Sequence, residues 1–137
     1  MTQATDTLEV AIINHFFRGV SQTATSGWVA LYNGNPTDTA AAGTDVTTTV
    51  RPAGRVAAGF AAPTSGAGTA SNAATIDFGS TTADVTITHF AVFDAASGGN
   101  MLTYGALLDA NLNAVTRTLL AGDGLTFPAG TLIVTVA

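Results

Sequence analysis

The chain has 137 residues, of which 47% are hydrophobic and 9% are charged, and its formal net charge is −5. This length fits one domain with a real core, and so apolar a composition excludes disorder driven by charge. The cations are four arginines, without lysine, which excludes a basic nucleic-acid footprint and a polybasic membrane patch. Cysteine is absent too, so there is no disulfide framework and no thiolate metal site. The longest apolar runs are far shorter than the roughly 20 residues of a transmembrane helix. We therefore predict no direct contact with nucleic acid or membrane.

The scarcity of charge is itself informative. A dispersed monomer usually carries about 25–35% charged residues on its surface, whereas this chain has 9% in total. We infer that much of its surface is hidden against other chains.

One helix is evident near the start, where Asp6 and Glu9 have capping-box spacing with Asp6 as the cap. An apolar set then follows at helical spacing: Leu8, Ile12, His15 and Phe16, widened by Val10, Ile13 and Phe17. Arg18 suits a helix C-terminus, and Gly19 is a natural stop. The pattern predicts a helix over residues 7–18. Its apolar face is too broad for a solvated helix, so we expect it to lie against a sheet or another subunit.

The rest of the chain reads as strands and turns. Residues 37–50 are mostly Ala, Thr and Gly, which is typical of a long loop. Residues 85–94 form the clearest strand, in which Ile87 and His89 share one face and Thr88 and Phe90 share the other. Further strands are predicted at 27–32, 55–62, 74–78, 101–108, 115–120, 125–127 and 132–136.

About seven or eight short strands at this spacing predict a mainly β fold, an antiparallel β-sandwich or small barrel with one N-terminal α-helix. We expect residues 1–137 to form a single domain, with an arm and helix over 1–19 and the sandwich over 27–137. The last strand carries no charge, proline or bulge, and such a strand is unsafe as an exposed edge. We expect it to be interior to a sheet or covered by another subunit.

Candidate catalytic groups are few: two His, one Glu and eight Asp, with no G-x-S-x-G motif. We predict no enzyme activity, no catalytic residues and no cofactor. His15 and His89 are interpreted as packing or contact residues, although a metal shared between them and an Asp remains open.

Two binding alternatives also stay open. Asp38 and Asp45 in the predicted loop suit a calcium site with loop carbonyls, although their spacing is not that of an EF-hand. Trp28 and Tyr32 lie at i and i+4 on one strand face, which would suit sugar stacking, but core packing is the favoured interpretation.

Four stretches resemble, in order and spacing, a family of small tailed-bacteriophage virion proteins over roughly residues 13–136. They are INHFFRG, GWVALYNGNPTD, ITHFAVFDAASGGNMLTYGAL and LLAGDGLTFPAGTLIVTV. Family members have a helix ending in FRG, a VALFTADPTD-like strand, a GIYDAATGGNLLFYGAL-like hairpin and a PAG turn. The chain departs at RPAGR, residues 51–55, where the family often has GYARQ.

The resemblance implies a structural virion protein, either a capsid cement (decoration) protein or a tail-fibre component that binds host glycan. We favour cement on the capsid surface, with the major capsid protein as partner, because the chain is short, charge-poor and without fibrous repeats. A homotrimer would suit local three-fold positions. The N-terminal helix, or residues 1–7 before it, is the candidate contact arm. The candidate interface residues are Leu8, Ile12, His15, Phe16, Arg18, Leu132, Val134 and Val136.

Overall fold

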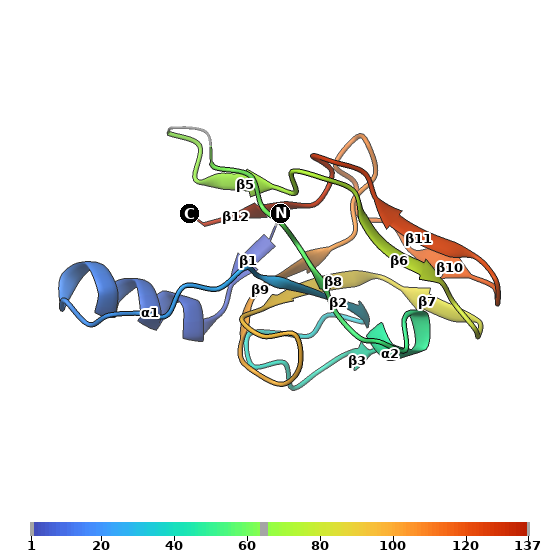
Figure 1. The fold of residues 1–137 in the computed structure, drawn as a ribbon, viewed down its shortest axis with the longest axis horizontal. Coiled ribbons are helices and arrows are strands. Elements are labelled where there is room, and N and C mark those ends of the chain that lie inside the picture. Colours follow the sequence, from blue (N-terminus) through green and yellow to red (C-terminus); the bar gives the residue numbers. More distant parts are fainter. Residues whose placement is uncertain (1, 64–65, 137) are drawn as a thin grey trace.

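The computed structural model describes residues 2–63 and 66–136 (Figure 1). Its elements are β1 (Thr2–Ala4), α1 (Asp6–Phe17), β2 (Trp28–Asn33), β3 (Thr44–Asp45), α2 (Thr47–Val50), β4 (Val56–Ala57), β5 (Thr69–Ser71), β6 (Ile76–Ser80), β7 (Val85–Ile87), β8 (His89–Phe93), β9 (Met101–Ala106), β10 (Arg117–Leu119), β11 (Gly124–Phe127) and β12 (Ile133–Thr135). The predicted fold class is confirmed: the protein is mainly β, its strand pairs are antiparallel, and a helix lies near the N-terminus. The described strands do not close into a barrel.

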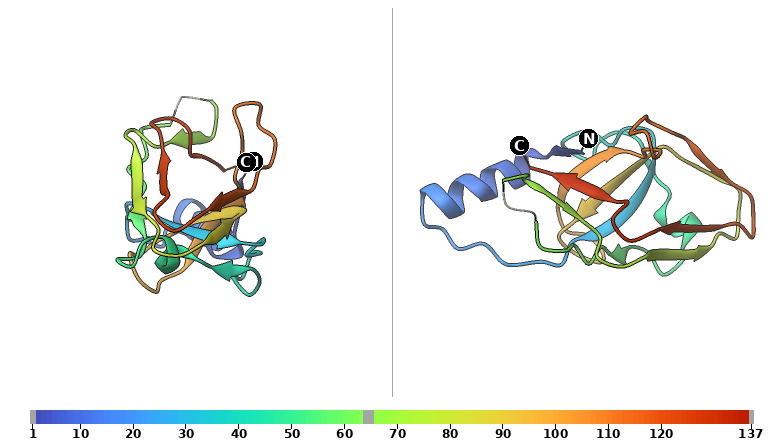
Figure 2. Two further views of the ribbon diagram at one scale, coloured as in Figure 1. Left: turned by 90° about the vertical axis from the view of Figure 1, so that its right-hand side faces the viewer. Right: turned by 90° about the horizontal axis from the view of Figure 1, so that it is seen from above.

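The largest sheet has six strands in the order β1-β9-β8-β2-β3, with β4 also pairing with β2. Its centre is formed by β2, β8 and β9, whose register aligns Ala30 with Ala91 and Ala91 with Tyr104. Three two-stranded sheets complete the described fold: β10-β7, β11-β6 and β12-β5. The β10-β7 and β11-β6 pairs lie at the end of the molecule opposite α1, whereas the β12-β5 pair lies beside β1 (Figures 1 and 2).

The six-stranded sheet buries side chains on both faces. On one face Leu31 and Phe90 belong to a cluster that also includes Phe78 of β6 and Leu125 of β11, so this cluster joins the sheets. On the other face lies a second cluster: Ala30, Tyr32, Ala91, Phe93, Met101 and Tyr104. Because both faces of the sheet are buried, its central strands need no cover from another chain.

The loop after β8 closes over the second cluster. The guanidinium of Arg55 stacks 3.5 Å from the ring centroid of Phe93 and donates to the carbonyls of Ala95 and Gly98 at 2.9 and 2.7 Å. Asp94 accepts the backbone N–H of Asn100 at 2.8 Å. The charge of Arg55 is thus used to order a loop of the same chain.

Residues 85–94 are two strands, whereas their alternation predicts one. Thr88 separates them: its N–H donates to the carbonyl of Tyr32 and its carbonyl accepts from the N–H of Leu107, both at 2.9 Å. These bonds shift the alternation, so Ile87 and Phe90 lie in the same cluster although the sequence pattern puts them on opposite faces. The chain passes at this point from the β10-β7 sheet to the six-stranded sheet.

The prediction of one long loop over residues 37–50 is wrong at its end, where β3 and α2 form. Asp45 accepts the N–H and hydroxyl of Thr47 at 2.9 and 2.5 Å. Thr47 in turn accepts the N–H of Leu31 at 2.9 Å, and Val50 is fully buried. Contacts with β2 therefore order a segment that composition alone describes as loop.

The last strand is not interior to a sheet as expected. β12 pairs with β5 on one side, and Val136 donates to the carbonyl of Gly68 at 2.9 Å. On its other side, the N–H of Thr135 donates to the hydroxyl of Thr2 at 2.7 Å. A side chain, rather than a neighbouring strand, satisfies this part of the edge. Coverage by another subunit stays a prediction.

Candidate assembly surfaces

The helix α1 is fixed to the body at its first turn. Thr5, and not Asp6 as predicted, is the N-cap: its hydroxyl accepts the N–H of Leu8 at 3.3 Å. The same hydroxyl donates to the carbonyl of Met101 at 2.6 Å, and Thr5 is fully buried. The cap lies one residue earlier than predicted because a hydroxyl, unlike a carboxylate, can also donate to the sheet.

The other end of α1 terminates as predicted. Gly19 adopts a positive φ of 68°, and the N–H of Val20 donates to the carbonyl of Asn14 at 2.9 Å. Figure 1 shows α1 projecting from the side of the body that carries β1, with the following segment returning beside it. The helix is therefore held at its base while its last turn stands away from the sheets.

The projecting helix has a broad uncovered apolar surface, and none of its residues is buried. Val10, Ile13 and Phe17 follow at i, i+3 and i+7, which places them along one stripe. Phe16 extends this stripe by one further position. The exposed fractions are 56% and 53% for Val10 and Ile13, and 74% and 80% for Phe16 and Phe17. We call these four residues the α1 face.

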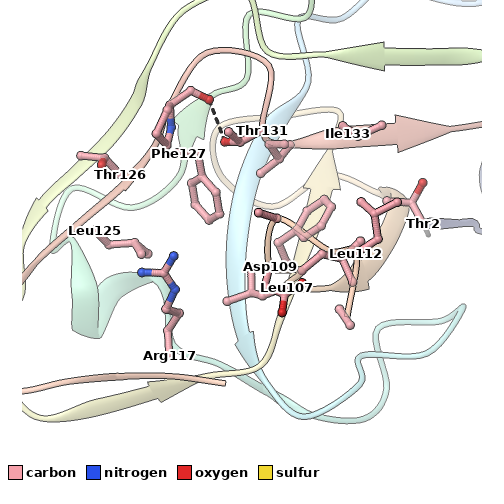
Figure 3. A pocket seen from close by; sticks show the side chains of 16 residues that line it. Thr2, Leu107, Asp109, Leu112, Arg117, Leu125, Thr126, Phe127, Thr131 and Ile133 are labelled. Carbon is pink, nitrogen blue, oxygen red and sulfur yellow. Dashed lines mark hydrogen bonds between the residues drawn. The ribbon is translucent and has the colours of Figure 1, made fainter. Parts of the chain in front are cut away.

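A second apolar surface lies in the body, as a groove of about 490 Å³. It is bounded by the end of β9 and the loop that follows, by β10 and β11, and by the start of β12, with Thr2 of β1 and Phe90 of β8 also lining it. Figure 3 shows the ring of Phe127 in this groove, with Leu112 on the loop and Arg117 beside Leu125. We call it the β11–β12 groove.

The loop at the rim of the groove is held by hydrogen bonds within itself. Asp109 accepts the N–H groups of Asn111 and Asn113 at 2.8 and 3.0 Å, and these bonds lower the pKa of its carboxyl. The N–H of Leu112 donates to the carbonyl of Asp109 at 3.0 Å. Leu112 is held with a positive φ of 63° and is 69% exposed. The loop thus fixes a large apolar side chain in an unfavourable backbone conformation at the groove rim.

The predicted interface residues fall into two groups. On α1, Leu8 and Ile12 are half-buried, whereas His15, Phe16 and Arg18 are exposed. In the last strand region, Leu132 is 2% exposed and lies in the first cluster, Val134 packs against that cluster, and Val136 is 46% exposed. Leu132 is therefore part of the core and not an exposed contact residue, and the role of the eight residues as an interface stays a prediction.

Sequence reasoning placed Val10, Ile13 and Phe17 on the helix but left them out of the interface, and it missed the groove. The helical period alone could have grouped Val10, Ile13 and Phe17. The groove could not be found this way, since it joins Leu112 with residues such as Phe127 from another element.

The histidines and the Trp28–Tyr32 pair do not form a binding site. His89 is half-buried, its Nδ1 lies 2.8 Å from the hydroxyl of Thr88, and burial lowers its pKa. His15 is exposed and stacks edge-on against Phe16 at 4.8 Å between ring centroids. Tyr32 is only 5% exposed, so it does not form an open sugar-stacking platform with Trp28.

The two loop carboxylates have separate partners. Asp38 accepts the hydroxyl of Tyr104 at 3.0 Å, while Asp45 caps the turn at Thr47. Burial, followed by this bond to Asp38, raises the pKa of Tyr104. Within residues 2–63 and 66–136, no three His, Asp or Glu side chains gather closely enough to hold a metal ion.

No helix in the described part of the chain is long and apolar enough to cross a membrane. What the described residues offer is a well-packed β body with two uncovered apolar surfaces, the α1 face and the β11–β12 groove. Uncovered apolar surfaces of this size are typical of proteins that bind other chains.

Comparison with protein families agrees with that class. The chain belongs to the family described as podophage GP4 fiber I protein gp80, whose model matches residues 3–135. The expected membership of a family of phage virion proteins is thereby confirmed, and the chain is a virion-type structural protein. No curated protein gave a significant match to the chain.

Proposed function

We propose that this chain is a capsid cement protein, a non-enzymatic subunit that binds the assembled major capsid protein lattice and stabilises the phage head from its surface. The observation that carries the proposal is that the α1 face stays uncovered on a body whose own core is complete, so its cover comes from other subunits of the particle, either copies of this chain or capsid protein. Phe16 and Phe17 are the most exposed large apolar side chains among the described residues, and nothing in the body covers them. Family membership supports a structural role in the particle.

The mechanism would be selective binding of the assembled lattice. A protein that binds only the assembled shell shifts the equilibrium away from dissociated capsomers by mass action. A homotrimer at a local three-fold position would contact several capsomers at once, which multiplies weak individual contacts. The low charge of the chain suits a subunit that is largely surrounded by neighbours.

A fibre subunit is the second candidate, because the matching family is described as a podophage fiber I protein. In this case the same apolar surfaces would attach the chain to the tail or to further fibre subunits. A glycan-binding role would need a surface other than the Trp28 and Tyr32 pair, because Tyr32 is buried.

Immunogold electron microscopy of intact particles, with antibody against the recombinant chain, separates the two candidates. We expect label spread evenly over the heads. Label confined to the tail or fibres would overturn the cement proposal and support the second candidate.

A binding experiment tests the mechanism. The recombinant chain should co-sediment with assembled heads that lack it, and should not bind unassembled major capsid protein. Equal binding to both forms would contradict stabilisation by lattice-specific binding.

A further inference from the structure

We propose that the β11–β12 groove of one copy of this chain receives the α1 face of a second copy. The contact would be a self-assembly interface with Phe16 and Phe17 as anchors and Leu112 at the rim. It does not depend on whether the chain sits on the head or the tail.

The helix cannot reach the groove of its own chain. The hydroxyl of Thr5 is bonded to the carbonyls of Met101 and Leu102 at 2.6 and 3.1 Å, which fixes the direction in which α1 leaves the sheet. Figures 1 and 2 show α1 at the end of the molecule opposite β10 and β11. A helix α1 that fills the groove must therefore belong to another copy of the chain.

The sizes of the two surfaces fit an interface between copies. Phe16 and Phe17 alone leave roughly 300 Å² of ring surface exposed, because a buried aromatic residue covers about 150–250 Å². A stable interface covers about 800 Å² on each partner. When every copy contributes one helix and one groove, the area buried per copy is the sum of both surfaces. Leu108, Leu112 and Ile133 add exposed apolar area at the groove.

Charges on the two surfaces are complementary. The groove is lined by one carboxylate, Asp109, and one guanidinium, Arg117. The first turn of the helix carries two exposed carboxylates on the side of the α1 face, since Asp6 precedes Val10 and Glu9 precedes Ile13 by four residues. An orientation of α1 that brings its first turn to Arg117 therefore pairs opposite charges, whereas one that brings it to Asp109 opposes like charges.

The conformation of Leu112 points the same way. A leucine with positive φ costs stability where asparagine or glycine would cost less, and this leucine is 69% exposed. Its side chain gains little within the chain for that cost. Contact with a partner helix would bury this leucine and offset the cost of its backbone conformation.

Because helix and groove are different surfaces, the contact is heterologous. It closes either as a reciprocal exchange between two copies or as a ring of three or more. Each closed form leaves no α1 face or groove unoccupied.

The first test is the mass of the recombinant full chain in solution, measured by light scattering and native mass spectrometry. The wild type should be a closed oligomer at micromolar concentration. The double substitution Phe16→Glu and Phe17→Glu should weaken the oligomer at least about tenfold, as should Leu112→Asn. Thermal unfolding of the variants checks that the body remains folded. Leu112→Asn should not destabilise the chain, because asparagine tolerates the positive φ better than leucine does.

Leu120→Glu is the matched control, because Leu120 is 59% exposed and does not line the groove. It should leave the oligomer intact. A monomeric wild type, or an oligomer that survives the helix and groove substitutions, would overturn the proposal.

A disulfide experiment tests the pairing itself, since the natural chain has no cysteine. Proteins carrying Phe16→Cys and Leu112→Cys, mixed and oxidised, should form mixed dimers in preference to either homodimer. Ala96→Cys, on an exposed loop, replaces Leu112→Cys in the control mixture and should not pair with Phe16→Cys. A preference for Phe16→Cys homodimers would indicate helix-to-helix packing and contradict docking in the groove.

Discussion

Two apolar segments of this chain, β2 and α1, have opposite surroundings. In β2, Val29, Ala30 and Leu31 have no exposed surface, because β8 pairs along the strand and a buried cluster covers each face. In α1 no residue is buried. Apolar composition therefore indicates which surfaces must be covered, but it does not indicate whether the same chain or another chain covers them.

The largest expected change in the free energy of unfolding comes from removing a phenylalanine from the core, and removing one from α1 should have little effect. Phe78 is 2% exposed and packs edge-on against Phe127, with 6.1 Å between ring centroids. Phe78→Ala should lower the free energy of unfolding by about 3–5 kcal/mol. Phe17→Ala should change it by less than about 0.5 kcal/mol in a monomeric background such as Leu112→Asn. Urea unfolding measures both. Similar costs at the two positions would break the comparison.

The loop over the second cluster should be sensitive at one glycine. Gly99 has a φ of 69°, and a Cβ there would collide with the side chain of Asp94 and lie 2.8 Å from the Cβ of Ala95. Gly99→Ala should cost about 2–3 kcal/mol through backbone strain and steric overlap.

Gly98→Ala is the control, because its φ is 62° and nothing lies within 4 Å of its added Cβ. It should cost only about 1–2 kcal/mol, the backbone strain alone. Thermal unfolding compares the pair. Equal losses would mean that the loop relaxes around the methyl group added in Gly99→Ala and is less tightly built than the rest of the body.

The junction between the two regions should have an intermediate effect. Thr5→Val keeps the side-chain volume but removes the hydroxyl that caps α1 and binds the carbonyl of Met101. The expected loss is about 1–2 kcal/mol, with faster amide exchange in the first turn of α1. Thr7→Val, on an exposed position of the same turn, should change stability by less than about 0.5 kcal/mol. Unchanged exchange in Thr5→Val would show that the helix direction is set by other contacts.

The smallest effect concerns pH and the groove rim. Backbone N–H bonds from Asn113 and Asn111 lower the pKa of Asp109 in the folded chain. The stabilisation from the charged carboxylate is therefore fully present above the pKa that Asp109 has in the unfolded chain. It is lost as pH falls through the lower pKa that Asp109 has in the folded chain. The melting temperature of Asp109→Asn should lie below that of the wild type at neutral pH, and the difference should narrow in acid. A constant difference across this range would exclude the charged form as the cause.

Much of the local structure could be predicted from the amino-acid sequence. Capping chemistry and helical spacing located α1 within one residue at each end, and Gly19 ended it as expected because only a glycine adopts its positive φ without cost. The alternation and turn residues around β2, β8 and β9 identified the central strands and the antiparallel class. The order of the short motifs also indicated the virion family.

Where local patterns were ambiguous, contacts between distant parts of the chain set the structure. Hydrogen bonds of Thr88 with Tyr32 and Leu107 divided a sequence that alternates as one strand, and contacts with Leu31 ordered the Thr47 turn. The groove joins Leu112 to β11 and β12 from separate parts of the chain, so no local pattern encodes it. The α1 face is the intermediate case. The sequence predicted that it must be covered, but only the fixed direction of α1 from Thr5 decided that the rest of the chain leaves it open, because side-chain burial depends on where the whole chain runs.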